Sequence, residues 1–396
     1  MRYRLLTNRK RDCTGCTACA AACPQACIMM ESDKNGFRVP KIDHKKCISC
    51  GMCEKTCPVM HPLGTGMNLP EAYAACSKNE AVRMQSSSGG VFTELAKIVL
   101  KQGGAVFGAA YTEQFEVVHI CVEDEMSLEK LQGAKYAQSQ LVGIFSDVKA
   151  RLGRGQVVLF CGTPCQVAGL KAYLKKEYSN LILVDFICHS VPSPMAWKEY
   201  VKFRACQDND GVLPEKINLR DKTTGWSRYQ HSNLFSYGIG KEYLTRSSDS
   251  LYMKLFTGGY ISRESCANCR FKGYSRASDL TLGDFWGIWD VAPEMDDNRG
   301  TSVVLVQTEK GALLLSEAES DMILKTVNLD EVSKQNAALL ESHGENEDRE
   351  IALRMIRKGR MASIEKLFVP PKHVLWRKIR RKACQMIRKG YRHVHR

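Results

Sequence analysis

The sequence lacks any run of about eighteen apolar residues, which is the length that crosses a bilayer as a helix. Residues 1–12 are basic but contain no apolar stretch of the kind that a secretory signal peptide needs. A cysteine-rich segment begins directly after them, at Cys13. We therefore expect neither a membrane span nor export. The expected location is the cytoplasm.

Most of the chain also lacks an excess of charge of either sign. The whole sequence has a formal net charge of +14, from 57 Lys and Arg against 43 Asp and Glu. Residues 354–396 contain fifteen Lys or Arg and a single acid, Glu365, so the rest of the chain is balanced at 42 basic and 42 acidic residues. A neutral body gives no electrostatic support to nucleic-acid binding, and we expect none.

Cysteine, in contrast, is abundant, with eighteen residues in a chain of 396. Disulfide scaffolds are typical of short secreted proteins, whereas this chain is long enough for two or three domains and its densest cysteines have metal-ligand spacing. Thiols that are kept for metal indicate a reducing compartment, in agreement with a cytoplasmic location.

Eight of the cysteines form two copies of the pattern C-x2-C-x2-C-x3-C-P within residues 13–58. In bacterial-type ferredoxins of this spacing, three cysteines of one copy bind a 4Fe-4S cluster together with the fourth cysteine of the other copy. A pair of zinc sites is the alternative, but zinc does not need eight evenly spaced cysteines with Pro after each fourth. The sequence predicts cluster one on Cys13, Cys16, Cys19 and Cys57, and cluster two on Cys47, Cys50, Cys53 and Cys23.

A change of pattern near residue 66 divides the chain. Pro62, Gly64 and Gly66 are typical of a linker, and beyond residue 71 apolar strands alternate with helical stretches. We expect strands at 105–110, 157–160 and 181–187, and helices at 91–101, 165–176 and 196–206. This alternation predicts an α+β ferredoxin module at 1–66, a larger α/β domain with a mixed sheet at 67–330, and a helical basic tail at 331–396.

Five further cysteines lie where strands are expected to end, or in a loop. In open α/β sheets such strand ends form the ligand crevice. From their spacing alone these thiols could bind a third cluster, bind zinc, or be buried without a ligand. They are Cys161, Cys165, Cys188, Cys266 and Cys269.

Six longer segments, taken in order, resemble a known family. They are Ser86-Ser-Ser-Gly-Gly-Val-Phe-Thr93, Gly133-Ala-Lys-Tyr136, Gly162-Thr-Pro-Cys-Gln-Val-Ala-Gly-Leu170, Cys188-His-Ser-Val-Pro-Ser-Pro194, Arg220-Asp-Lys-Thr-Thr-Gly-Trp226 and Ser278-Asp-Leu-Thr-Leu-Gly-Asp-Phe-Trp-Gly287. Over about residues 71–310 the chain resembles the coenzyme F420 hydrogenase/dehydrogenase beta-subunit family. The resemblance implies FAD and a third 4Fe-4S cluster on Cys165, Cys188, Cys266 and Cys269. Cys161 is then a neighbour of that cluster or a substitute ligand.

The small residues before the helix expected at 91–101 are the candidate flavin site. Backbone N–H groups at a helix N-terminus bind phosphate well, although a serine-rich helix cap without a ligand explains the same pattern. The resemblance favours the flavin, with Lys135 and Tyr136 supplying a charge and an aromatic face near it. The residues expected to contact FAD are Ser87, Ser88, Gly89, Gly90, Lys135 and Thr163.

The acid or base of the reaction is not identified by the sequence. His189 follows Cys188 and is a candidate for proton transfer, although a lone histidine more often has a structural role. Asp284, at the end of an expected strand, is an equally weak candidate for the acid or base.

The expected function follows from the mismatch between hydride and cluster chemistry. A hydride carries two electrons and an iron–sulfur cluster accepts one, and FAD converts between them. The sequence thus predicts an iron–sulfur flavoprotein oxidoreductase that exchanges hydride with coenzyme F420 or another carrier, and single electrons with a redox partner protein through three clusters. The alternatives are an electron-transfer subunit that serves a separate enzyme, and a structural protein whose middle cysteines bind zinc.

The basic tail has a helical pattern of its own. Apolar residues between 374 and 387 recur at helical spacing, and Lys and Arg fill the other face. Each Lys or Arg near an anionic membrane contributes ~1 kcal/mol, so this helix could hold the protein peripherally on the inner membrane face. A solvated helix docked on the protein's own core or on an acidic partner explains the pattern as well.

Overall fold

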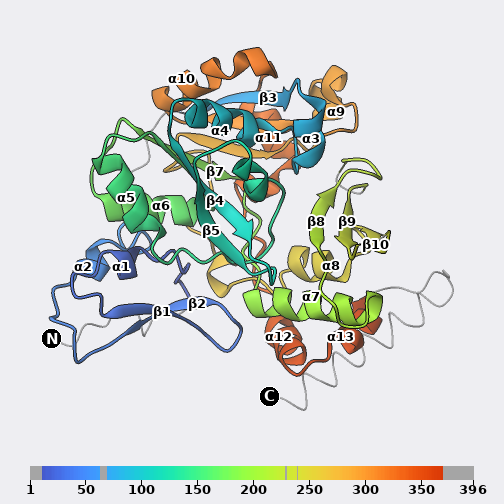
Figure 1. Cartoon of the computed structure of the whole chain (residues 1–396), viewed down its shortest axis with the longest axis horizontal. Helices are drawn as coiled ribbons and strands as arrows, with labels where there is room; N and C mark the ends of the chain where they lie inside the picture. Colours follow the sequence, from blue (N-terminus) through green and yellow to red (C-terminus); the bar gives the residue numbers. More distant parts are fainter. Residues whose placement is uncertain (1–10, 63–68, 228–229, 239, 369–396) are drawn as a thin grey trace.

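The structure is a computed structural model that describes residues 11–62, 69–227, 230–238 and 240–368 (Figure 1). Among these residues no helix is both long and apolar enough to cross a membrane. The basic amphipathic helix expected at 374–387 lies outside the described residues.

The N-terminal module consists of two short helices and a hairpin, in blue at the lower left of Figure 1. Strands β1 (Ile28–Ser32) and β2 (Arg38–Ile42) pair antiparallel. Helices α1 (Ala18–Ala21) and α2 (Met52–Lys55) each start after a residue in the left-handed region, Thr17 and Gly51 respectively. These positive φ angles turn each cysteine loop sharply before its helix begins. The module is the α+β unit that the sequence predicts.

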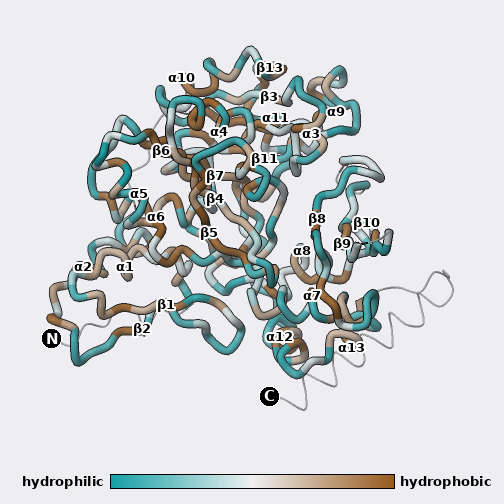
Figure 2. Tube along the Cα trace, in the orientation of Figure 1, coloured by the Kyte–Doolittle hydropathy of each residue, from teal (hydrophilic) through white to brown (hydrophobic). Residues whose placement is uncertain are grey.

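An eight-stranded mixed sheet forms the centre of the larger unit. The strand order is β13-β3-β12-β11-β7-β6-β4-β5, in which β4, β6, β7 and β11 run parallel and the outer strands antiparallel. Figure 2 shows that the central strands are among the most apolar parts of the chain. The strands are β3 (Glu71–Ser77), β4 (Ala105–Tyr111), β5 (Val117–Val122), β6 (Val158–Cys161), β7 (Leu181–Phe186), β11 (Leu280–Asp284), β12 (Ser302–Val306) and β13 (Met322–Val327).

Helices cover both faces of this sheet. Successive side chains of a strand point to opposite faces, so one strand contributes to the cores on both sides. In β6, Leu159 packs in one core with the helices α4 (Val91–Lys101) and α10 (Glu309–Glu317). Its neighbours Val158 and Phe160 pack in the opposite core with α5 (Ile144–Gly153) and α6 (Pro164–Leu174). The predicted α/β domain with a mixed sheet is therefore confirmed.

A second sheet and a helical layer lie beside the central sheet, and this second sheet was not predicted from the sequence. It has the order β10-β9-β8, from β8 (Lys216–Asp221), β9 (Ser232–Ser236) and β10 (Glu242–Arg246). Its core is aromatic, with Trp197, Tyr200, Phe235 and Tyr252 fully buried. The helices of this layer are α7 (Pro194–Asp208), α8 (Leu251–Thr257), α12 (Arg349–Arg357) and α13 (Met361–Phe368).

Short elements complete the fold. Helix α11 (Leu329–Gln335) packs on β3, and α12 packs on α7, so residues 329–368 lie against the body of the protein. The domain boundaries near 66 and 330 stay predictions. The remaining helices are α3 (Glu80–Gln85), α9 (Ile288–Val291) and α11 (Leu329–Gln335), with 3-10 turns at Ser127–Leu131, Glu264–Cys266, Pro293–Met295, Glu319–Asp321 and Ala337–Leu339.

The ferredoxin module docks on helix α6 at Gly169. A Cβ at this position would lie 2.9 Å from Cβ and 3.0 Å from Sγ of Cys16, which is closer than atoms pack. Arg263 supports the same contact, because its Nε donates a 2.6 Å hydrogen bond to the carbonyl oxygen of Cys13. The module therefore rests on the larger unit with one of its predicted cluster ligands at the contact.

Gly169→Ala should loosen this contact, because the new methyl group must displace Cys16. We expect the free energy of unfolding to fall by about 1–3 kcal/mol, as in other overpacked cores, with faster hydrogen exchange in residues 13–58. The control is Gly153→Ala in α5, where a Cβ meets nothing within 4 Å. That variant should be stabilised by up to about 1 kcal/mol. Equal stabilisation of both variants would contradict the close contact.

Candidate redox-cofactor site

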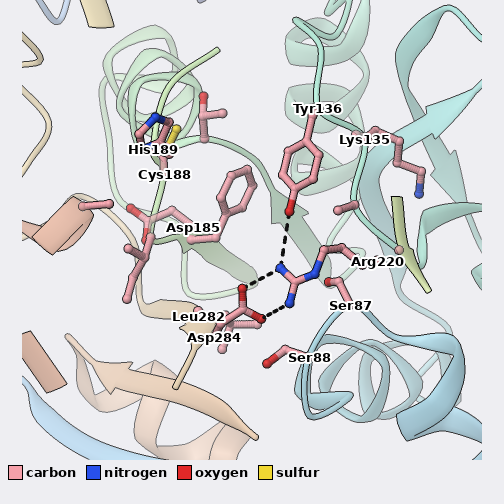
Figure 3. A pocket seen from close by; sticks show the side chains of 18 of the residues that line it. Ser87, Ser88, Lys135, Tyr136, Asp185, Cys188, His189, Arg220, Leu282 and Asp284 are labelled. Carbon is pink, nitrogen blue, oxygen red and sulfur yellow. Dashed lines mark hydrogen bonds and ion pairs between the residues drawn. The ribbon is translucent and has the colours of Figure 1, made fainter. Parts of the chain in front are cut away.

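A cavity of about 770 Å³ lies at the carboxyl ends of β6, β7 and β11. It is walled on the other side by residues of the second sheet and of α8. Figure 3 shows Arg220 of β8 and Asp284 of β11 turned toward one another. Thr14 of the ferredoxin module also lines it. The crevice that open α/β sheets offer at their strand ends is thus present, as the sequence suggested.

The serine loop, residues 86–90, lies at one end of the cavity, and hydrogen bonds to its backbone fix its position. The ammonium group of Lys222 donates hydrogen bonds to the carbonyl oxygens of Arg83 and Ser88, the latter at 2.6 Å. The indole N–H of Trp226 donates to the carbonyl oxygen of Ser87 at 3.1 Å. Burial lowers the pKa of Lys222 to about 7. Residues Ser87, Ser88 and Gly90 line the cavity, and α4 begins directly after them.

Gly89 is not among the residues that line the cavity, so the structure does not bring it to the other expected flavin contacts. Its N–H donates a 2.9 Å hydrogen bond to Oγ of Ser302 on β12, so this amide is already used. A Cβ at Gly89 would overlap the carbonyl oxygen of Ala75 on β3. The glycine is needed for a close approach of the loop to the sheet and offers nothing to a ligand.

Lys135 and Tyr136 form the opposite wall. The ammonium group of Lys135 donates to the carbonyl oxygens of Gln132 at 2.5 Å and Lys130 at 3.0 Å, and desolvation lowers its pKa to about 7. The ring of Tyr136 packs on Phe256 with 4.9 Å between centroids. Both side chains line the cavity, so the structure brings them to the same space as the serine loop.

Four cysteines lie near one another, and two of them, Cys165 and Cys188, line the cavity. Cys165 lies in the first turn of α6 and Cys188 directly after β7, while Cys266 and Cys269 flank the end of a 3-10 turn. Burial raises the pKa of Cys165, and the other three thiols raise it further through their charge. The backbone N–H of Val191 donates to Sγ of Cys266 at 3.4 Å.

Two neighbours of this group differ in their surroundings. Thr163 begins α6 and its hydroxyl lies 3.2 Å from Sγ of Cys165, so it touches a thiol as well as the cavity. Cys161 ends β6, and burial raises the pKa of its thiol to about 12 with Asp185 as its main charged neighbour. Cys161 is therefore set apart electrostatically from the four.

Within the described part of the chain, no three His, Cys, Asp or Glu side chains converge closely enough to hold a single metal ion. A single zinc ion needs its ligands around one point, whereas a cubane is bound at separate corners by thiolates that stand further apart.

The N-terminal cysteines divide into two places. A small cavity of about 40 Å³ is lined by Cys13, Cys16, Cys19 and Cys57, the set predicted for cluster one. Of the other set, Cys23, Cys47 and Cys53 pack around Cys27, and Cys50 is exposed. Sγ of Cys27, which lies outside the motif, is 3.3 Å from Sγ of Cys23.

His189 lines the cavity beside Cys188. Its ring meets the edge of Phe256 at 5.1 Å and lies parallel to His343 at 5.5 Å. Burial lowers the pKa of His189 to about 4, so the imidazole is neutral near pH 7. Nε2 of His189 is buried without a hydrogen-bond partner among the described residues.

A buried ion pair in the cavity wall was missed by the sequence analysis. Arg220 on β8 forms two hydrogen bonds with Asp284 at the end of β11, at 2.7 and 3.0 Å, as Figure 3 shows. Burial alone would lower the pKa of Arg220, but Asp284 and Tyr136 together raise it above its usual value, so the guanidinium stays charged. Both residues occur in segments that carry the family resemblance, but only the fold brings these segments together.

Two family models match the chain. Residues 155–332 match the model for the C-terminal region of the coenzyme F420 hydrogenase/dehydrogenase beta subunit, and residues 12–60 match the 4Fe-4S dicluster domain. One relative is a component of the F(420)H(2) dehydrogenase of Methanosarcina mazei, 23% identical over 223 residues, which are 53% of this chain and 60% of that protein. Another is a component of the NADH-quinone oxidoreductase of Pelobacter propionicus, 42% identical over 65 residues, 14% of this chain and 35% of that protein.

Among solved structures, a chain of the F420-reducing NiFe hydrogenase complex from Methanosarcina barkeri is similar. It has a TM-score of 0.46 and 16% identity, and the match covers 77% of this chain and 95% of that one. The chain spans less than two thirds of the length of the curated relatives that it matches.

Buried histidines should make the protein less stable in acid. Burial lowers the pKa of His119 and of His231 to about 4, from 6.5 in an unfolded chain. The unfolded state then binds more protons than the folded state between these values, so the free energy of unfolding should fall as the pH drops from 6.5 toward 4, by about 1–3 kcal/mol for each residue. His119→Gln should reduce this pH dependence in urea titrations at pH 7 and pH 5. If the free energy of unfolding of the variant fell by as much between pH 7 and pH 5 as that of the parent, a neutral buried His119 would be contradicted.

Proposed function

Because the chain joins a 4Fe-4S dicluster domain to a domain of the coenzyme F420 hydrogenase/dehydrogenase beta-subunit family, we propose that it is an iron–sulfur flavoprotein oxidoreductase. On this proposal the chain transfers electrons between a hydride donor or acceptor and a one-electron partner. The observation that carries it is the extent of the cavity. One cavity reaches from Ser87 to Cys165 and Cys188, and it also touches Thr14 of the ferredoxin module.

The cavity fits FAD in size and in chemistry. Its volume of about 770 Å³ is typical of small-molecule sites, and the first turn of α4 offers N–H groups to a pyrophosphate. Buried polar atoms without a partner, such as Nε2 of His189, are expected where a ligand completes the site. Bound FAD would supply exchange of a hydride on one side and of single electrons on the other. The residues proposed to hold it are Ser87, Ser88, Gly90, Lys135 and Thr163.

The four cysteines of the larger unit are the proposed ligands of a third 4Fe-4S cluster. Lys272 supports them, because its ammonium group donates hydrogen bonds to the carbonyl oxygens of Cys188 and Ala338 at 2.5 and 2.6 Å. This cation lies near Cys188, Cys266 and Cys269, where it would offset the negative charge of thiolates. The proposed ligands are Cys165, Cys188, Cys266 and Cys269.

Helix α6 connects this proposed site with the ferredoxin module. Cys165 lies in the first turn, and Gly169, four residues further and about 6 Å along the axis, contacts Cys16. The proposed third cluster and cluster one would then be neighbours, and cluster two, with exposed Cys50, would lie nearest to solvent. This order supports a relay from the cavity to a protein partner at the surface of the module.

The substrate and partner are proposed from the relatives. The matched proteins are named as subunits, one of an F(420)H(2) dehydrogenase and one of an NADH-quinone oxidoreductase. We therefore propose a redox partner protein, and coenzyme F420 or another hydride carrier as the small-molecule substrate. His189 is the residue that we propose for proton transfer, because its unpartnered Nε2 lies beside the cavity and its ring is neutral near pH 7.

Anaerobically purified protein should contain about twelve irons and one FAD per chain, with little zinc, because each of three cubanes holds four irons. Cys165→Ser should lower iron by about four per chain and leave the N-terminal clusters intact. Cys206→Ser, which changes an exposed thiol of α7, is the control and should keep full iron. A parent protein with about eight irons, or a Cys165 variant with full iron, would refute the third cluster. A parent without FAD that still relays electrons would favour an electron-transfer protein with no substrate of its own.

Ser87→Asp should weaken FAD binding by at least about tenfold. Ser87 is half-buried and lines the cavity just before α4, so a carboxylate there would repel a pyrophosphate while the helix N-terminus tolerates it. Ser87→Asn is the matched control, because Asn has the same shape without the charge. Flavin and iron should be quantified together, and iron should stay at the parent level in both variants. If the Asp variant retained parent-like flavin affinity, the phosphate would have to bind elsewhere.

A further inference from the structure

One end of the cavity presents two polar atoms that the ion pair and the serine loop do not use. They are Nε of Arg220, on β8, and Nε2 of His231, just before β9. Both atoms are buried without a hydrogen-bond partner among the described residues, and the two side chains are only 4% and 5% exposed. Both residues line the cavity. A buried polar atom without a partner is costly unless a ligand satisfies it.

The two atoms have opposite hydrogen-bonding character. The terminal nitrogens of Arg220 already donate to Asp284, so Nε–H is the donor that remains. Nδ1 of His231 lies 3.2 Å from the carbonyl oxygen of Ser227, which can only accept, so Nδ1 carries the proton. Burial lowers the pKa of His231 to about 4, so the ring is neutral and Nε2 is an acceptor.

The two residues lie against the same aromatic ring. Asp221 pairs with Ser232 in the second sheet, which puts Arg220 and His231 diagonally across the two strands on one face. The guanidinium carbon of Arg220 is 5.3 Å from the centre of the Trp286 ring, and the His231 ring is 6.4 Å from it and nearly parallel. Trp286 also lines the cavity. A flat ligand could therefore lie beside an indole while its edge meets a donor and an acceptor.

The charge of this end is balanced, which decides the class of ligand. Asp284 binds Arg220 with both carboxylate oxygens, so the pair has no net charge to offer to a phosphate or a carboxylate. A neutral edge with one C=O and one N–H matches a donor and an acceptor better than an anion does. Such an edge occurs in the pyrimidinedione of flavins and deazaflavins and in the carboxamide of nicotinamide.

We infer that Arg220, His231 and Trp286 form a subsite for the amide or imide edge of a redox-active ring. The C=O of that edge accepts a hydrogen bond from Nε of Arg220, and its N–H donates to Nε2 of His231. This inference rests on the proposed function, because a redox ring has to enter the cavity. The ring is either the flavin itself or the hydride-carrying substrate, and both present the same chemistry to these side chains.

The test uses variants of the full chain that remove either the acceptor or the donor of the subsite. His231→Phe removes the acceptor and keeps a flat ring beside Trp286, whereas His231→Gln keeps an acceptor oxygen. Arg220→Lys keeps the charge but removes Nε–H together with the paired hydrogen bonds to Asp284. Arg246→Gln on β10, an exposed residue outside the cavity lining, is the control. Iron per chain in each variant verifies that the protein is folded and loaded.

The measurements separate the two sources of the ring. FAD per chain and the flavin midpoint potential are measured first, and then kcat and KM with coenzyme F420 and with NADH as probes. If the flavin occupies the subsite, His231→Phe and Arg220→Lys bind FAD at least about tenfold more weakly or shift its potential. If the substrate occupies it, FAD and its potential stay at parent values, and KM for the active probe rises about tenfold or more with kcat nearly unchanged. In either case the effect of His231→Gln should be smaller than that of His231→Phe, because Gln keeps an acceptor oxygen.

Three outcomes would overturn the inference. Parent-like FAD content, potential and KM in both His231→Phe and Arg220→Lys would show that no ligand edge meets these atoms. An equal loss in Arg246→Gln would show a general effect on the second sheet. A parent protein that holds no flavin and reacts with neither probe would refute the proposed function and this subsite with it. A flavin-loaded parent with insensitive variants would refute the subsite alone.

Discussion

The contact of Cys16 with helix α6 at Gly169 is the constraint on which the arrangement depends. It fixes the ferredoxin module against the same helix whose first turn carries Cys165. Arg263, three residues before Cys266, reinforces this contact. Its guanidinium group donates one hydrogen bond to the carbonyl oxygen of Cys13 and another to Gln138 in the cavity wall. A shift of the module would therefore move Cys16, a predicted cluster ligand, relative to the cavity. It would also move Cys16 relative to the four cysteines of the larger unit. Rigid spacing of this kind is what single-electron transfer between separate sites requires.

The charged residues around the cavity are hard to explain by stability alone. A buried ion pair such as Arg220 with Asp284 recovers little more than the cost of its desolvation, and apolar residues of equal size would often serve as well. Lys222 is held among carbonyl oxygens behind the serine loop, with a pKa lowered to about 7. Groups with strongly shifted pKa values that cluster at a cavity are typical of functional sites. The wall of this cavity is thus organised for a ligand as well as for folding.

Patterns local in the sequence were enough for part of this structure. The helix at Val91–Lys101 and the strands β4, β6 and β7 lie where apolar periodicity puts them, within one or two residues, and the mixed α/β sheet follows from their alternation. Contacts between distant segments could not be read in that way. Arg220 meets Asp284 across 64 positions, and Gly89 faces β3 and β12 and not the cavity. A glycine beside serines has the same sequence signal whether it approaches a phosphate or a strand. The second sheet was missed because its strands are short and one of them is largely exposed.

The burial of the cysteines gives a direction to the proposed relay. Cys16 and Cys19 are buried at the small cavity, whereas Cys50 in the other half of the module is exposed. Reduction potentials depend on solvent exposure and on hydrogen bonds to sulfur, so two clusters of one type in these places would differ in potential. In the proposed function, the cavity would keep bulk water away from a hydride, and a solvent-facing cluster would let a protein partner approach. On the proposed function, the chain would therefore separate two-electron chemistry inside the larger unit from one-electron exchange at the surface of the module, with α6 between them.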